Sequence, residues 1–228
     1  MRKTTLGLLF SIFATLSCQA EGLTPTELRW LQGSWPVLTY ARDAGLPLDI
    51  VVQPQPAAGL PPIALAFIDG RCKFVLSLRD NPEVQATVAR VDPDLLDAAL
   101  ELMAAHELGH CRRHVSGAWR SLPAGRVQPG PEKLPPQARA DYEDMQAVRR
   151  EEGYGDLVGL AWIGEHRSAQ YARMHAWLVA ERSIMRVPGG HHDTLAWVAL
   201  AASAQRLAGK DIFEAAALLW EDGLEAAR

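Results

Sequence analysis

The chain has 228 residues, of which 48% are apolar and 22% are charged. This composition is typical of a globular protein and excludes a disordered, collagen-like or membrane-embedded chain. Its 23 Lys and Arg residues against 27 Asp and Glu give a net charge of −4, without a dense basic stripe. We therefore expect no nucleic-acid partner. The three cysteines, Cys18, Cys72 and Cys111, are an odd number, so at least one of them cannot pair within the chain.

The first twenty residues have the pattern of a secretory signal peptide. A positively charged start is followed by an apolar stretch at 6–16 and by small residues that lead to a cleavage site after Ala20. The apolar stretch is shorter than the about 20 residues that a membrane-spanning helix needs. We expect a mature chain of residues 21–228 in the periplasm or secreted, with no transmembrane segment. A lipoprotein attached through Cys18 is the alternative.

The mature chain, expected to be a single domain, begins with a predicted helix and three predicted strands. Thr24 and Glu27 have the spacing of a capping box, and Pro36 is expected to kink or split the helix that follows. Asp69-Gly70 lies between two apolar runs and predicts a hairpin turn. The predicted elements are a helix at 24–44 and strands at 48–52, 63–68 and 72–78, which we expect to form a small antiparallel sheet.

The remainder of the chain is predicted to be mostly helical. Asp92-Pro93 is a good helix start, and a long helical pattern follows it. The segment Ser116–Gln137 then holds five prolines and three glycines, which indicates a loop long enough to act as a lid. Helical patterns return at 138–162, 168–185, 194–207 and 212–227. The order of the predicted elements along the chain, with strands first and helices after them, favours an α+β domain in which a small sheet packs on helices.

The pattern His-Glu-x-x-His occurs within the helix that follows Pro93. His106 and His110 are four residues apart, so both imidazoles project from one helix face and can reach one zinc ion. Glu107 lies beside the open coordination position, where a carboxylate can take a proton from water. Chance would give only about 0.01 such matches in a chain of this composition. The motif predicts a zinc site that hydrolyses amide bonds.

A third ligand must come from another element. His114 lies about 12 Å along the helix axis from the first histidine, which excludes it, and we expect it to be surface-exposed. Glu152 and Asp156 form an i, i+4 pair that can supply one ligand carboxylate and one acceptor for the N–H of a ligand histidine. Glu151 and Glu143 remain alternative ligands, and a solvated, charged helix face is the other interpretation of this run of charges.

Together these motifs resemble those of the gluzincin metallopeptidases, most closely the HtpX and CAAX prenyl protease family with its soluble periplasmic members. The second motif of that family is typically E-x-E-A-D, and here Glu152-Gly-Tyr-Gly-Asp156 keeps both outer acids. The resemblance covers about residues 95–207 and implies a zincin-like domain. It implies zinc ligands His106, His110 and Glu152, catalytic base Glu107, and Asp156 behind a ligand histidine.

Family members often carry a later His-Pro-Ser/Thr segment, whose histidine is thought to steady the oxyanion. The matching segment here is His191-His192-Asp193-Thr194, and the resemblance favours His192 for this role. The other interpretation is that the histidine pair lies at the surface or caps the helix that begins near Thr194.

Removal of the signal peptide leaves two cysteines, and export favours their pairing. We expect a disulfide between Cys72 and Cys111, which would tie a strand of the hairpin to the helix of the first motif. That strand would then lie where such peptidases bind the substrate backbone by edge pairing. Two buried free thiols are the alternative.

The function expected from these patterns is an exported zinc metalloendopeptidase acting on peptides or unfolded proteins. The alternative is a catalytically weak or inactive zinc-binding envelope protein that acts as a binding or chaperone-like module. No organic cofactor is expected.

Overall fold

A computed structural model describes residues 22–53, 57, 59–127, 134–184 and 186–226. The predicted signal peptide and the middle of the predicted lid lie outside the described residues. Within them the chain is α+β and mostly helical, as expected. No helix in this part of the chain is both long enough and apolar enough to cross a bilayer. The elements are α1 (Pro25–Asp43), β1 (Leu48–Val52), β2 (Ile63–Ile68), β3 (Arg71–Leu76), α2 (Pro82–Ala89), α3 (Leu96–Val115), α4 (Pro136–His166), α5 (Tyr171–Ile184), α6 (Leu195–Leu200) and α7 (Ile212–Ala226).

The predicted capping box begins α1. The Thr24 side chain accepts from the Glu27 backbone N–H, and Glu27 in turn accepts from the Thr24 N–H. Glu27 is fully buried and also pairs with Arg79, at 2.9 Å between Oε2 and Nη2. Of the two expected effects of Pro36, a split of the helix is excluded, because α1 is continuous through it. Buried residues on both sides of the proline, among them Trp30, hold both halves of the helix to the core.

The three strands form one sheet in the order β1-β3-β2, and this sheet is mixed rather than antiparallel. β2 and β3 form the predicted hairpin, whose turn residues Asp69 and Gly70 both have positive φ. β1, in contrast, pairs in parallel with β3, with Leu48 opposite Cys72. The hairpin places β3 between the other two strands, so the free edges belong to β1 and β2. The expectation that the Cys72 strand offers an edge to substrate is therefore wrong.

Two helical predictions need correction. The short helix α2 was not predicted, although Asn81 caps it through the Glu83 N–H and Pro82 occupies its first turn. The predicted helix at 194–207 is instead α6 followed by a 3₁₀ turn at Ala204–Arg206. The helices at 168–185 and 212–227 correspond to a 3₁₀ turn plus α5 and to α7.

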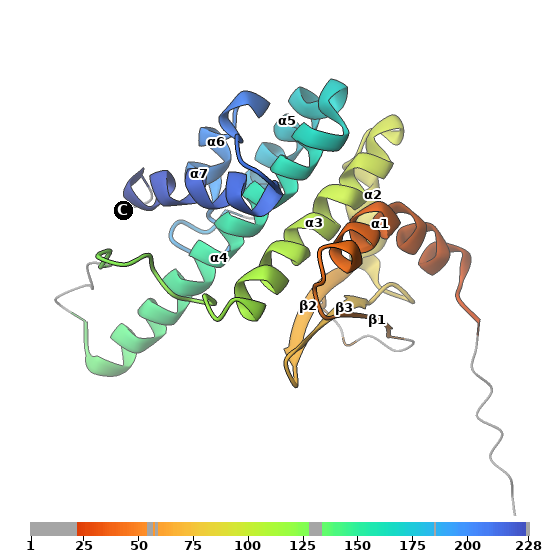
Figure 1. Cartoon of the computed structure of the whole chain (residues 1–228). Helices are drawn as coiled ribbons and strands as arrows, with labels where there is room; N and C mark the ends of the chain where they lie inside the picture. The colour runs from red at the N-terminus through yellow and green to blue at the C-terminus, as the bar shows by residue number, and fades with distance from the viewer. Residues whose placement is uncertain (1–21, 54–56, 58, 128–133, 185, 227–228) are drawn as a thin grey trace, which may run out of the picture.

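Helix α3 lies at the centre of the molecule, with α1 and the sheet on one side and α4 on the other (Figure 1). Helices α5, α6 and α7 pack against α4. Glycines allow α3 and α4 to approach closely. A Cβ on Gly109 would lie 3.3 Å from the Cα of Gly155, and one on Gly159 would lie 2.9 Å from the Leu102 carbonyl oxygen.

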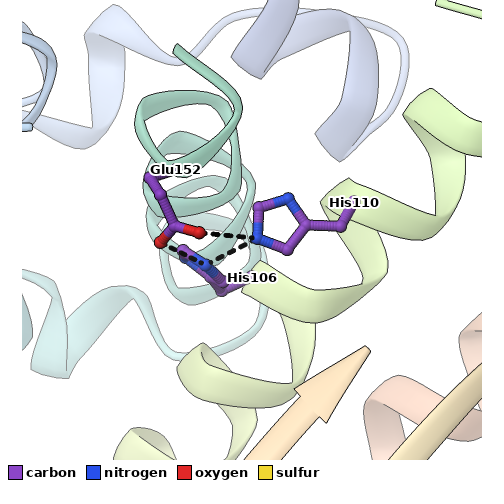
Figure 2. Close-up of side chains that lie close together, drawn as sticks. All are labelled: His106, His110 and Glu152. Carbon is purple, nitrogen blue, oxygen red and sulfur yellow. Dashed lines mark hydrogen bonds and ion pairs between the residues drawn. The ribbon is translucent and has the colours of Figure 1, made fainter. Parts of the chain in front are cut away.

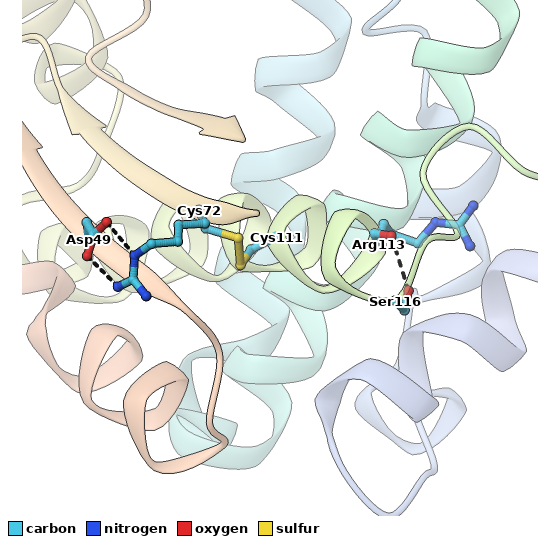
Figure 3. Close-up of a disulfide and its surroundings, with 6 residues drawn as sticks. Asp49, Cys72, Cys111, Arg113 and Ser116 are labelled. Carbon is cyan, nitrogen blue, oxygen red and sulfur yellow. Dashed lines mark hydrogen bonds and ion pairs between the residues drawn. A yellow bond between two sulfur atoms is a disulfide. The ribbon is translucent and has the colours of Figure 1, made fainter. Parts of the chain in front are cut away.

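The predicted disulfide between Cys72 and Cys111 is present, with the two Cα atoms 5.7 Å apart. Figure 3 shows it joining the sheet to α3. Both residues are completely buried, and the alternative of two free thiols is wrong. Because Cys111 directly follows His110, the cross-link fixes α3 against the sheet at the level of the first motif.

Candidate metal centre

His106 and His110 lie one turn apart on α3 and face Glu152 on α4 (Figure 2). The two Nε2 atoms are 3.0 Å apart. The Glu152 carboxylate lies 3.4 Å from Nε2 of His106 and 3.5 Å from Nε2 of His110. Both histidines are buried, and the Glu152 side chain is 16% exposed. In the described part of the chain, these three side chains form the only group of three or more His, Cys, Asp or Glu residues close enough together to hold a metal ion.

The spacing of these atoms fits a zinc ion. Nitrogen and oxygen ligands lie about 2.0–2.1 Å from zinc in a tetrahedral arrangement, which places them about 3.4 Å from one another. The nearest-atom separations of 3.0, 3.4 and 3.5 Å lie close to that value, with the carboxylate approaching His106 through Oε2 and His110 through Oε1. Two imidazoles and one carboxylate are also the donor set of many catalytic zinc sites, and they leave a coordination position open.

Asp156 supports His106 from behind. Nδ1 of His106 lies 3.0 Å from Oδ1 of Asp156, so a proton on Nδ1 is donated to this carboxylate and the lone pair of Nε2 is directed at the metal position. Burial alone would lower the pKa of His106, but hydrogen bonds to Asp156 and Glu152 outweigh it and raise the pKa to about 10. The negative charge that favours a proton here also favours a divalent cation.

Two residues that the sequence analysis missed support Asp156 in turn. The Arg182 guanidinium on α5 donates to both of its carboxylate oxygens, at 2.8 and 2.5 Å. The Thr194 hydroxyl donates to its Oδ2 at 2.5 Å. Burial would raise the pKa of Asp156, but Arg182 and His106 hold it well below the usual range. Asp156 is therefore an anion at neutral pH although it is fully buried.

Catalytic roles were predicted for Glu107, as the general base, and for His192, as the residue that steadies the oxyanion. Glu107 follows the first ligand on α3, and burial raises its pKa against the attraction of His106 and His110. His192 lies in the turn before α6, where its Nε2 is 3.5 Å from Oε2 of Glu152. The structure thus brings His192 to the cluster, while its side chain stays 56% exposed.

The alternative third ligands lie elsewhere. Glu151 is buried and accepts from both Nε and Nη2 of Arg113, each at 2.9 Å, on a different face of α4. Glu143 is exposed on the same helix. His114 is not the exposed polar residue that we expected, because its ring is stacked between Phe67 and Trp119.

Gly155 is the glycine in closest contact with a candidate ligand. A Cβ at this position would lie 2.8 Å from Cε1 and Nδ1 of His106 and 2.9 Å from its Nε2. The imidazole therefore rests directly on the backbone of α4. The glycine between the two acids of the second motif makes room for the histidine of the first.

Comparisons of the chain with models of known protein families, with curated proteins and with solved structures found no match. The resemblance to gluzincins accordingly depends on the two motifs and on the cluster that they form.

Proposed function

We propose that this protein is an exported zinc-dependent metallopeptidase. The observation that carries the proposal is the convergence of His106, His110 and Glu152, whose nearest nitrogen and oxygen atoms lie 3.0–3.5 Å apart. Glu107 directly follows His106 on α3 and is half-buried. A carboxylate beside a two-histidine, one-carboxylate zinc site is the arrangement that zinc peptidases use to activate water.

Zinc held by these residues would supply Lewis acidity and lower the pKa of a water molecule towards about 7. Glu107 accepts the proton of the attacking water and later passes it to the leaving amine. His192, next to Glu152 and open to solvent, donates a hydrogen bond to the carbonyl oxygen as negative charge develops on it.

We propose peptides or unfolded proteins outside the cytoplasm as the substrates. The buried Cys72–Cys111 disulfide supports an oxidising compartment, since such bonds are rare in the cytosol.

The test combines metal content and hydrolysis of a broad peptide library. We expect about one zinc per chain in the wild type and in Glu107→Gln, with hydrolysis by this variant about 10²- to 10⁴-fold slower. Glu152→Ala is expected to lose zinc. Glu143→Ala removes an exposed acid from the same helix and serves as the matched control, with zinc and activity unchanged.

Two outcomes of this test would contradict the proposal. Equal hydrolysis by the wild type and Glu107→Gln, with zinc bound in both, would favour the inactive zinc-binding module instead. Unchanged zinc stoichiometry and affinity in Glu152→Ala would remove the third ligand on which the site depends.

A further inference from the structure

The two candidate histidine ligands are supported differently on the side away from the metal position. Nδ1 of His106 faces Asp156. Nδ1 of His110 is buried and has no hydrogen-bond partner among the described residues. Metal-binding histidines almost always donate their second ring N–H to an acceptor, which fixes the orientation of the ring. Another kind of contact must therefore orient His110.

Besides the ring of His106, whose centroid is 4.6 Å away, the imidazole of His110 contacts Trp119, which follows α3 in the Pro/Gly-rich segment. The rings of Trp119 and His110 are nearly perpendicular, at 89°, with centroids 5.4 Å apart. Edge-to-face contact of this kind is a favoured geometry between aromatic rings. It restricts rotation of the imidazole without using either nitrogen, so it leaves Nε2 free to bind a metal.

Trp119 is itself held by a row of rings that ends at the sheet. Its ring stacks on His114 with centroids 4.0 Å apart, and His114 stacks on Phe67 of β2 at 4.7 Å. His114 is four residues after His110, so the two imidazoles project from the same face of α3. The row Phe67–His114–Trp119 thus joins β2 to a candidate ligand.

The backbone next to Trp119 is also fixed. The N–H of Arg120 donates to Oε1 of Glu151 at 2.8 Å, and Nη2 of Arg113 donates to the Ser121 carbonyl at 2.8 Å. Arg113 and Glu151 bind each other, and their side chains are 12% and 1% exposed. The acid next to Glu152 in the sequence therefore holds the segment that carries Trp119.

We propose that Trp119 is a positioning residue for His110, and that docking of residues 118–121 and metal binding are coupled. The proposal rests on the proposed function only in requiring that the site bind a metal. If docking of Trp119 favours the binding geometry of His110, a bound metal must favour docking by the same factor. The coupling therefore predicts two effects that can be measured independently.

The first effect is on metal affinity. In purified protein, Trp119→Leu is expected to weaken zinc binding by about 10- to 100-fold, the range for loss of a residue that orients a ligand. The visible spectrum of the Co²⁺-loaded variant is expected to change, because the coordination geometry changes. Trp119→Phe keeps an aromatic ring and is expected to have the zinc affinity and the Co²⁺ spectrum of the wild type. Trp35→Leu, which alters an exposed tryptophan on α1, is the matched control and is expected to leave both unchanged.

The second effect is on the segment. In the wild type, zinc is expected to slow hydrogen exchange of the Arg120 amide by at least tenfold. In Trp119→Leu this slowing is expected to disappear, while exchange in the rest of α3 away from the site keeps its wild-type rate. This measurement on the wild type also tests the proposal if the leucine variant fails to fold.

The outcomes separate the two proposals. Wild-type affinity and Co²⁺ spectrum in Trp119→Leu, or no effect of zinc on the Arg120 amide, would overturn the role of Trp119 and leave the peptidase intact. Zinc binding with the expected coupling but no hydrolysis would support Trp119 and contradict the peptidase. A wild type that binds no zinc would overturn both.

Discussion

Replacing Gly155 with alanine tests whether contact between α3 and α4 sets the geometry of the metal site. The added Cβ would lie 2.8 Å from the His106 ring, about 0.6 Å closer than the 3.4 Å at which ordinary van der Waals contact begins. The ring has little freedom to move away, because Asp156 and Glu152 hold its two nitrogens at 3.0 and 3.4 Å. If α4 moves instead, Glu152 moves with it.

A shift of this size exceeds the about 0.5 Å within which a functional site must be held. We expect Gly155→Ala to weaken zinc binding at least tenfold and to slow hydrolysis by at least the same factor, since a misplacement of about 1 Å costs about 100-fold. Helix propensity acts in the opposite direction, because alanine is favoured over glycine by about 1 kcal/mol. The loss would therefore be local to the site rather than a loss of the helix.

The matched control is Gly164→Ala in the same helix. Its Cβ would meet nothing closer than 3.4 Å, so we expect unchanged zinc affinity and a stability gain of up to about 1 kcal/mol. Zinc affinity is measured by competition with a chromophoric chelator, and stability by urea unfolding of the metal-free proteins. If the zinc affinity of Gly155→Ala is within twofold of that of Gly164→Ala, close contact between α4 and the His106 ring does not set the geometry of the site.

Three further predictions concern the support of the site and of the fold. Asp156→Asn is expected to weaken zinc binding about 10- to 100-fold in the same competition assay, because a neutral amide supports His106 poorly. Replacing Cys72 and Cys111 together by alanine is expected to lower the free energy of unfolding by about 4 kcal/mol, from a cross-link that spans 39 residues. Burial would raise the pKa of Glu27, but hydrogen bonds from Arg79 and Thr24 hold it below 4.5. Its ionised form therefore stabilises the fold above about pH 4.5. Glu27→Gln should lower the free energy of unfolding by about 2 kcal/mol at pH 7, and by progressively less as the pH falls below about 4.5.

Each of these has a contradicting result. An Asp156→Asn protein with wild-type zinc affinity would show that the carboxylate does not orient His106. A double alanine variant that unfolds at the wild-type urea concentration would show that the cross-link adds no stability. For Glu27→Gln, a cost that stays constant or grows from pH 7 to pH 3 would show that the charge of Glu27 is not what stabilises α1.

Local spacing in the sequence predicted the residues that form the cluster. The four-residue intervals of His106/His110 and Glu152/Asp156 place each pair on one helix face, and both pairs do meet in the structure. The choice between Glu151 and Glu152 needed the structure, because neighbouring residues point about 100° apart and the rotation of α4 decides which one faces α3. That rotation follows from packing, including the contact of Gly155 with His106.

The residues that the sequence did not reveal come from distant segments. Arg182 and Thr194 reach Asp156 from 26 and 38 residues away, and no spacing rule connects them to it. The order of the strands was missed for a similar reason. Apolar alternation indicates that Leu48–Val52 is a strand, but not which neighbour it selects or in which direction it runs.

The pairing of Arg182 with Asp156 divides the site between two stretches of the chain. All three candidate ligands lie on α3 and α4, whereas the cation that keeps Asp156 ionised lies on α5 and the hydroxyl that binds it precedes α6. Substitutions in the C-terminal third can therefore change the charge behind His106 while all three candidate ligands stay the same. If the cluster binds zinc as proposed, its affinity can change in evolution or in engineering while the His-Glu-x-x-His motif remains intact.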